Sequence, residues 1–517
     1  MYDYVIVGGG SAGCVLAARL SEDPEVSVCL VEAGPRDDHA DIHVPIRFPE
    51  FFQTQYDWAY RSEQEKFCEG RQIALPRGRV LGGSSSINAM IYSRGHRSHY
   101  DQWGNLNWSF DTLLPYFKRA ENNERGASYY HGNDGPLPVC ESRSKNLISA
   151  AFIEAAIEAG HPANDDFNGA IQDGFGFYQL TQRDGRRCSA ATAYLQPALK
   201  RKNLTVKTDF MVHRVSLEGS TATGVTGVGR DGAVTIQAAR EVIICAGAYN
   251  SPQLLMLSGI GAAEHLKDQG IPVLVDNPEV GQNLSDHPHA LLVFTHPEKV
   301  SLLIAAEPRY GKQFTEEHNG PLTSNISEAG GFIRSHPNLP APDLQFHVAP
   351  TMFADGGLTT KHHAISFGAD ILEVKSRGEV TLTSHDPTAN PRIQHNYFSE
   401  PEDMELAVAS LRMSLHFSEQ KALSKYVKTP VEVPASDSDK DLRAYIRSYS
   451  STAFHPAGTC SIGTVVDDEL RVLGTERLRV VDASVMPTIF CNPNAPTIAI
   501  AERAADLIRG IVPLEVI

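Results

Sequence analysis

His455, in the stretch AFHPAGTC near the C-terminus, has a side chain suited to acid–base chemistry. A neutral imidazole, with an ordinary pKa of about 6.5, can take a proton near pH 7. Cys460, close to His455, suggests a metal site instead, but zinc needs three or four ligands and the sequence offers no others nearby, so we expect no metal. A buried imidazole bonded to a backbone carbonyl is the third interpretation.

The first segment of the chain has the order of a nucleotide-binding βαβ unit. Residues 3–8 (DYVIVG) read as a buried strand, GGGSAG places Gly8, Gly10 and Gly13 in G-x-G-x-x-G spacing, and a helical pattern and a second strand ending at Glu32 follow. Glycines at these positions allow a tight turn, close approach of a pyrophosphate and close helix–strand packing. An acid at the end of the second strand can accept hydrogen bonds from ribose hydroxyls. The pattern predicts a dinucleotide site but does not by itself separate NAD from FAD.

The bulk composition sets limits on size and partners. A chain of 517 residues exceeds what one core usually supports, so we expect at least two lobes. A net charge of −16 disfavours nucleic acid and anionic membranes as partners. The eight cysteines form no C-x-x-C pair, which argues against a disulfide framework. With no visible signal peptide and no apolar run long enough to span a membrane, we expect a cytoplasmic protein. The oligomeric state is left open.

Several later segments resemble one family. The stretch GRVLGGSSSINAMIYSRGHRSHYD (78–101) resembles the first signature of the glucose–methanol–choline (GMC) oxidoreductases, and GAYNSPQLLMLSGIG (247–261) resembles the second. Further similar segments are VGQNLSDHP, SRGEVTLTSHDP, VVDASVMP and the pair HPAGTC and NPNAPT. The resemblance extends from residue 2 to about residue 510, and it is greatest to bacterial FAD-dependent alcohol and choline dehydrogenases.

The resemblance implies an α/β (α+β) fold in which a Rossmann-like FAD-binding domain is interleaved with a substrate domain built on an antiparallel sheet. We expect the FAD domain to comprise residues 1–150, 190–295 and 445–517, and the substrate domain to comprise residues 151–189 and 296–444. Local patterns predict a hairpin of short strands in 223–247, strands at EVTLTS and PRIQHNYF in the second domain, a helix over 401–423 and a polar interdomain connection over 430–441.

The resemblance also implies the cofactor residues. Val212 would meet the adenine end, Asn88 and the turn from Gly82 to Ser86 would lie along the isoalloxazine, and Asp482 with Ala483 would meet the pyrophosphate and ribityl region. The helix that starts near Pro496 would point at the flavin N1–C2 edge. The full predicted FAD set is Gly8, Gly10, Ser11, Ala12, Gly13, Glu32, Ala33, Val80, Gly83, Ser84, Asn88, Met90, Val212, Ala246, Asp482, Ala483, Pro496 and Thr497. Some members attach FAD through a histidine where this chain has Ile87, so we expect non-covalent FAD.

The implied reaction is oxidation of a small alcohol, expected to be primary, with His455 as general base facing flavin N5 and Asn494 as its partner. Oxygen or another electron acceptor would then reoxidise the flavin. The alternatives are a cyanohydrin lyase of the same fold, the oxidase form of the same chemistry, a non-catalytic FAD-binding protein and an NAD-dependent dehydrogenase. We expect the substrate pocket walls to come from residues 300–370 and from Phe346 and Phe454, whose aromatic rings suit an apolar or aromatic alcohol; choline is a candidate for which no carboxylate-lined aromatic cage is visible.

Overall fold

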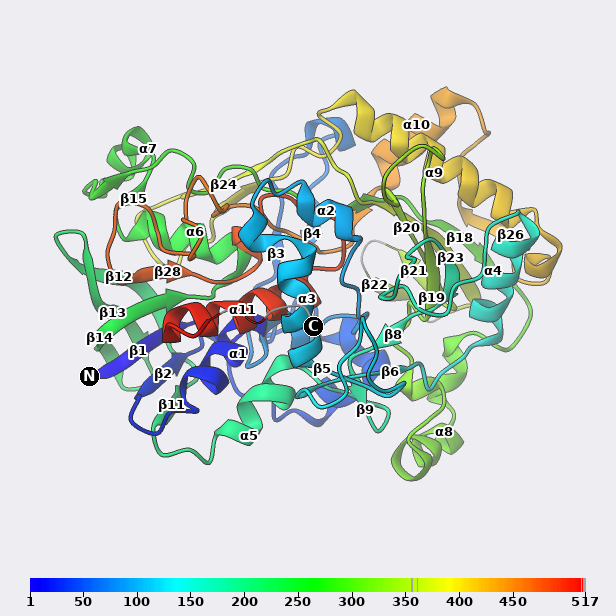
Figure 1. Ribbon diagram of the computed structural model, residues 1–517. Helices are drawn as coiled ribbons and strands as arrows, with labels where there is room; N and C mark the ends of the chain where they lie inside the picture. The colour runs from blue at the N-terminus through cyan, green and yellow to red at the C-terminus, as the bar shows by residue number, and fades with distance from the viewer. Residues whose placement is uncertain (355–356, 360, 513, 515–517) are drawn as a thin grey trace.

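The computed structural model describes every residue except 355–356, 360, 513 and 515–517. One of its two large sheets has seven strands, most of them from the first half of the chain (Figure 1). The strand order is β11-β2-β1-β14-β13-β12, with β28 beside β14. The strands are β1 (Tyr2–Val7), β2 (Val28–Val31), β11 (Leu204–Lys207), β12 (Met211–Glu218), β13 (Thr221–Gly229), β14 (Gly232–Ile244) and β28 (Leu478–Val480). β1 and β2 are almost wholly buried, as parallel strands covered on both faces must be.

The long strand β14 joins two kinds of pairing in this sheet. Its first half pairs antiparallel with β13, where Ile236 faces Val225. Its second half pairs parallel with β1, where Val242 faces Val5, and with β28 on its other side. The hairpin predicted in 223–247 is therefore confirmed. The expectation of short strands is wrong, because β14 runs through both parts as one strand of 13 residues.

Three helices on this sheet are held together around one buried acid. α1 (Ser11–Leu20) follows the glycine motif, and it packs against α11 (Asn494–Arg509), which in turn packs against α3 (Phe110–Ala120) (Figure 1). Glu502 of α11 has no exposed side-chain surface, and it accepts from Arg19 of α1, Arg119 of α3 and the hydroxyl of Tyr194. A buried carboxylate needs such donors, so these contacts hold α11 in place against α1 and α3.

The other large sheet has eight antiparallel strands, most of them from the second half of the chain. Its order is β26-β18-β23-β20-β19-β7, with β17 pairing both β23 and β27. The strands are β7 (Gly174–Phe177), β17 (Pro288–His289), β18 (Leu292–Thr295), β19 (Ala329–Ile333), β20 (Leu344–Ala349), β23 (Ala364–Ile371), β26 (Thr429–Glu432) and β27 (Ser451–Thr452). The helices α4 (Leu147–Glu158), α9 (Pro401–Ser418) and α10 (Asp439–Tyr449) share one apolar core with one face of this sheet.

The remaining elements connect and flank the two sheets. The helices are α2 (Arg97–Asp101), α5 (Gln196–Ala198), α6 (Gly247–Leu257), α7 (Ala263–Asp268) and α8 (Pro308–Lys312), and the short strands are β3 (Tyr60–Arg61), β4 (Ala74–Leu75), β5 (Glu121–Asn123), β6 (Leu137–Glu141), β8 (Gln179–Leu180), β9 (Gln182–Arg183), β10 (Arg186–Arg187), β15 (Ile260–Gly261), β16 (Val275–Asp276), β21 (Met352–Ala354), β22 (Gly357–Thr359), β24 (Glu379–Thr381) and β25 (Arg392–Gln394). None of the described helices is long and apolar enough to span a membrane.

Several local expectations differ from the structure. The strands predicted at EVTLTS and PRIQHNYF exist as β24 and β25, but they pair only with each other and not with the large antiparallel sheet. The segment predicted as a polar connection contains β26 and the start of α10. β17, β18 and β27 belong to the second sheet, although the expected boundaries put residues 288–295 and 451–452 in the first domain. Sequence runs of two to four residues carry too little periodicity to reveal this.

The close packing of the glycine motif gives a test of the fold. A Cβ at Gly13 would lie 1.9 Å from the Gly8 carbonyl oxygen, whereas a Cβ at Gly10 would meet its nearest atom at 3.9 Å. We expect Gly13→Ala to destabilise the ligand-free protein by about 1–3 kcal/mol or more, because backbone must move to make room. Gly10→Ala is the matched control and should unfold as the parent does. Denaturant unfolding of the ligand-free proteins measures both, and equal midpoints for Gly13→Ala and parent would contradict the packing argument.

Candidate active site

A cavity between the two sheets begins at the glycine motif. Gly8, Gly10, Ser11 and Ala12 line it at the start of α1. Gly8 has φ of +101° and lies against the carbonyl of Cys245, so it needs the conformational freedom of glycine. Gly13 does not line the cavity, because it is the residue that lets α1 pack on Gly8. The free N–H groups at the start of α1 therefore face open space, which is the arrangement that binds anions.

Glu32 and Ala33, at the end of β2, line the same part of the cavity. The Glu32 carboxylate accepts from the backbone N–H of Gly9 and from that of Gly34, each at 2.8 Å. Burial is the main influence on this carboxyl and raises its pKa to about 7, although the two N–H groups act in the opposite direction. Each oxygen keeps a second lone pair, so the predicted contact with a ribose hydroxyl is compatible with this geometry.

The turn from Gly82 to Ser86 is packed directly on the glycine motif. Gly82 N–H donates to the Gly9 carbonyl at 2.7 Å, and a Cβ at Gly83 would meet the Gly10 Cα at 2.7 Å. Gly83, Ser84, Asn88 and Met90 line the cavity as predicted. Val80 does not, because its side chain is buried in a small apolar cluster with Ile42, Phe51 and Ile87.

A residue that the sequence patterns did not single out, Arg187, holds this turn in place. Its buried guanidinium donates to the carbonyls of Ile42, Ser85 and Asn88 and to the Asn88 side-chain oxygen, at 2.8–3.1 Å. All four acceptors are neutral oxygens, and burial lowers the pKa of Arg187 to about 9. The contact orients the Asn88 carboxamide, whose oxygen also accepts from Met90 N–H.

Four other predicted cofactor residues also line the cavity. Val212 of β12, Ala246 before α6, and Asp482 and Ala483 after β28 all line it. The Asp482 carboxylate is already engaged: it accepts from Gly247 N–H, Ser251 hydroxyl and Ser484 N–H at 2.6–2.8 Å. These contacts close the loop after β28 against the start of α6.

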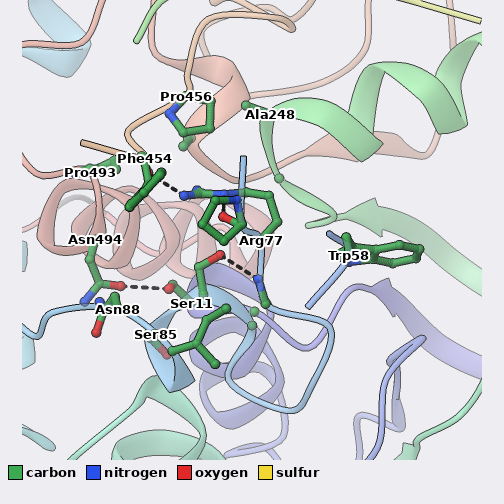
Figure 2. A pocket seen from close by; sticks show the side chains of 18 of the residues that line it. Ser11, Trp58, Arg77, Ser85, Asn88, Ala248, Phe454, Pro456, Pro493 and Asn494 are labelled. Atoms are coloured by element: carbon green, nitrogen blue, oxygen red, sulfur yellow. Dashed lines mark hydrogen bonds between the residues drawn. The ribbon is translucent and has the colours of Figure 1, made fainter. Parts of the chain in front are cut away.

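The structure corrects the prediction for Asn494. Asn494 is the first residue of α11, and its carboxamide oxygen accepts from the Ser11 hydroxyl at 2.8 Å (Figure 2). It lines the cavity, as does Thr497, whereas Pro496 does not. Asn494 thus joins the starts of α1 and α11 at the predicted nucleotide end, and it is not the residue hydrogen-bonded to His455.

The partner of His455 is Asn492, two positions earlier. Asn492 Nδ2 lies 3.2 Å from His455 Nε2, and the Asn492 carboxamide oxygen accepts from Gln345 Nε2 at 3.0 Å. Both His455 and Asn492 line the cavity. The sequence NPNAPT offers two asparagines, and its composition does not say which one faces the histidine.

Asp286 holds in place the backbone of His455 and that of the neighbouring His287. Its carboxylate accepts from the backbone N–H groups of His287 and His455 at 2.9 and 2.7 Å, and from the hydroxyls of Tyr397 and Thr452 at 2.6 and 2.5 Å. Burial disfavours ionisation of this carboxyl, but His395 and the two hydroxyls outweigh it, and the pKa of Asp286 lies below its ordinary value. The pairing of β17 with β27 then brings His287 Nδ1 to 3.0 Å from His455 Nδ1.

These contacts assign the protonation of His455. If Asn492 Nδ2 donates to Nε2, then Nε2 carries the lone pair and Nδ1–H points to His287. Burial, and after it the neighbouring His287, lower the pKa of His455 to about 3. The ring is therefore neutral near pH 7, with an acceptor nitrogen at the cavity. The core-imidazole interpretation is right about burial, since His455 is only 8% exposed.

Phe454 and part of β20 form further walls of the cavity. Phe454 lines the cavity in a left-handed backbone conformation, φ +64°, which is supported by Arg77 donating to its carbonyl at 2.5 Å (Figure 2). Phe346 was expected in the wall and is not there: it is fully buried in the core beneath the sheet. Its neighbours His347 and Ala349 line the cavity instead, because alternate residues of β20 point to opposite faces. Residues 355–356 and 360 of the expected 300–370 wall lie outside the described part.

The metal interpretation has no structural support in the described residues, where no group of three or more His, Cys, Asp or Glu could hold an ion. Cys460 is buried, and its backbone N–H donates to the Ser484 carbonyl.

Comparison with known proteins agrees with the arrangement of this site. Two models, both described as GMC oxidoreductase, match residues 2–289 and 374–501. Mitochondrial choline dehydrogenase of Homo sapiens is 42% identical, over 98% of this chain and 90% of its own length. Alcohol dehydrogenase (acceptor) of Pseudomonas putida is 42% identical, over 98% and 96%.

Solved structures give the same result. Pyridoxine 4-oxidase from Mesorbium loti superposes with a TM-score of 0.89 at 33% identity, and formate oxidase with 0.91 at 29%, each covering 98% of both chains. Family models that together cover most of the sequence, and relatives of this identity along nearly its whole length, place the chain in the GMC oxidoreductase family.

Proposed function

We propose that this protein oxidises a primary alcohol to the aldehyde with FAD, using His455 as general base and Asn492 to position the alcohol oxygen. The observation that carries the proposal is the 3.2 Å contact between Asn492 Nδ2 and the acceptor nitrogen of a neutral, cavity-lining His455. The chain is an oxidoreductase acting on CH–OH groups, as its alcohol and choline dehydrogenase relatives are. The cyanohydrin lyase and the NAD-dependent dehydrogenase are not favoured, because GMC oxidoreductases are FAD flavoproteins and these relatives are redox enzymes.

The cavity fits FAD at its nucleotide end. A Cβ at Gly10 would meet no atom closer than 3.9 Å, so the space beside this residue is open. The start of α1 presents its N–H groups to this space. From there the cavity continues past Val212 and Glu32, along the Gly83–Asn88 segment, to His455. Gly8, Ser11, Asp482 and Ala483 would hold the pyrophosphate region, and Asn88 would hold the ring edge. Bound there, FAD supplies the acceptor for the hydride that leaves the alcohol carbon.

The protein's own residues handle the proton. An alcohol oxygen that replaces the direct contact between Asn492 and His455 can give its proton to Nε2 while it accepts the Nδ2–H bond. Because an aliphatic hydroxyl is a very weak acid and the buried imidazole is a weak base, the proton must leave as the carbon is oxidised. Asp286 fixes the His455 backbone, and Gln345 fixes the Asn492 amide, so both groups are in position before substrate binds.

Substitution of the two residues tests their roles. We expect His455→Ala to reduce kcat by about 10²–10⁴ while FAD stays bound, since only the proton acceptor is lost. Asn492→Ala should slow flavin reduction in anaerobic stopped flow, because the oxygen is no longer positioned. His416→Ala, at an exposed position of α9, is the control and should leave the rate unchanged. Parent-like flavin reduction in His455→Ala would remove this histidine from the mechanism.

The lowered pKa of His455 gives a pH test. A histidine whose folded-state pKa lies near 3 stays neutral until the pH falls far below its ordinary value of about 6.5. We therefore expect the rate constant for flavin reduction at saturating alcohol to stay level from about pH 8 to about pH 5. An acid limb near pH 6.5 that disappears in His455→Ala would show that the ring titrates normally.

Whether FAD is bound covalently can be tested directly. Ile87, at the position where some family members carry the linking histidine, is buried in the apolar cluster with Val80 and has no nucleophile. We propose that FAD is held non-covalently by the loops described above. Precipitation of the holoenzyme with acid should leave the yellow colour in the supernatant. A yellow pellet that survives washing in denaturant would contradict this.

The electron acceptor is assigned by running an alcohol panel with oxygen and with an artificial acceptor. Hydrogen peroxide formed in air identifies an oxidase, and turnover that needs the added acceptor identifies a dehydrogenase. We favour the dehydrogenase, in line with the relatives of 42% identity.

A further inference from the structure

The cavity-facing side of the antiparallel sheet carries a cluster of two histidines and one acid. β17, β20 and β23 are neighbours, and they place His289, His347 and Asp370 along the cavity. The cluster adjoins the proposed catalytic pair, because Gln345, which holds Asn492, stands two residues before His347 on the same face of β20. Two residues along a strand span about 7 Å, roughly the length of a small alcohol.

Asp370 is the only acid of this cluster, and both of its oxygens are taken. Oδ1 accepts from His289 Nδ1 and Oδ2 accepts from His347 Nε2, each at 2.9 Å. The carboxylate has no exposed surface. His347 Nδ1 in turn pairs with the Ser327 hydroxyl at 2.9 Å. The Asp370 side chain, which also borders the cavity, is therefore covered by the two imidazole rings and has no exposed surface.

The other carboxylates that line the described part of the cavity are also engaged. Glu32 is bound by two backbone N–H groups at the nucleotide end, and Asp482 is bound by three donors beside α6. The guanidinium of Arg77 also lines the cavity and adds positive charge. The Trp58 ring already has the guanidinium of Arg79 over it, with 5.2 Å from its carbon to the ring centroid.

Several apolar side chains line this end of the cavity, together with Ser327 and Ser366. Phe48, Ile326 and Ala349 form one buried cluster with Phe52, and Phe52 meets Phe454 edge to face at 5.8 Å. An uncharged hydrocarbon group can be buried here without losing hydration that it needs. A quaternary ammonium group would be desolvated beside imidazoles and Arg77, and every carboxylate that lines the described part of the cavity is already engaged by other donors.

Building on the proposed function, we propose that the His289–Asp370–His347 cluster selects substrates by charge, so that this enzyme oxidises uncharged alcohols with an apolar body and rejects quaternary ammonium alcohols such as choline. His289 and His347 are the specificity-determining residues, because they cover the one carboxylate that could hold a cation. The 42% identity to choline dehydrogenases thus reflects the shared fold and catalytic end, and not a shared substrate.

The test compares two alcohols of the same shape. Choline and 3,3-dimethylbutan-1-ol differ in charge, with nitrogen in one replaced by carbon in the other. We expect kcat/KM for the neutral alcohol to exceed that for choline by about 100-fold or more in the holoenzyme, as unfavourable charge placement is strongly discriminated. Equal efficiency, or preference for choline, overturns the inference. If neither these nor other primary alcohols bleach the flavin anaerobically, the proposed function itself is wrong.

Three variants test whether the cluster is responsible. His289→Ala uncovers one oxygen of Asp370 and should raise the choline-to-neutral ratio by about tenfold. His289→Asn can return an N–H toward that oxygen and should restore the parent ratio. Adding Asp370→Asn to His289→Ala removes the charge and should abolish the gain. The ratio is measured with both substrates on one preparation, so it does not depend on the fraction of folded enzyme. An unchanged ratio in His289→Ala would assign the selection elsewhere.

Discussion

The candidate active site depends on the buried carboxylate of Asp286. Its four donors come from three separate segments: His287 beside it, Tyr397, and Thr452 with His455. A carboxylate removed from water is stable only when donors satisfy its oxygens, so these segments can pack together in one arrangement only. Without the carboxylate, two buried backbone N–H groups would lose their acceptor, at about 1–3 kcal/mol each. The position of the imidazole that we propose as general base is thus set in part by a contact of its own backbone N–H.

The nucleotide end of the cavity is held together by a second set of contacts. The glycine motif, the Gly82–Ser86 turn and the start of α11 all approach one another closely, through Gly10 against Gly83 and Ser11 against Asn494. Glu502 holds α11 against α1, and Arg187 holds the turn against Asn88. The nucleotide end is therefore closely packed around these contacts. A preorganised site of this kind needs little rearrangement to bring cofactor and base together.

The sequence predicted the parts of the fold that repeat a strong local pattern. The β1–α1–β2 unit and the hairpin that β14 forms with β13 follow from hydrophobic periodicity and glycine spacing. The choice between Asn492 and Asn494 could not be made this way, because both lie at the start of one helix and only the packing of α11 decides which side chain faces His455. The alternation of β20 was readable in LQFHVAP, where period two separates Phe346 from Gln345 and His347. Arg187 gave no signal, since its acceptors are backbone carbonyls distant in sequence.

Asp286 and Asp370 show how the same type of side chain can have two different roles in one cavity. Both are buried, both are ionised, and both act to raise the pKa of His455, although burial and His287 outweigh them. Asp286 is bound directly by backbone N–H groups and hydroxyls, with His395 4.0 Å away, and in the proposed mechanism its negative charge favours the proton that His455 would accept. Asp370 is bound directly by two imidazoles, which under the proposed selection would stand between its oxygens and the substrate. The same carboxylate chemistry would therefore support proton transfer on one side of the substrate and restrict direct contact with a cation on the other.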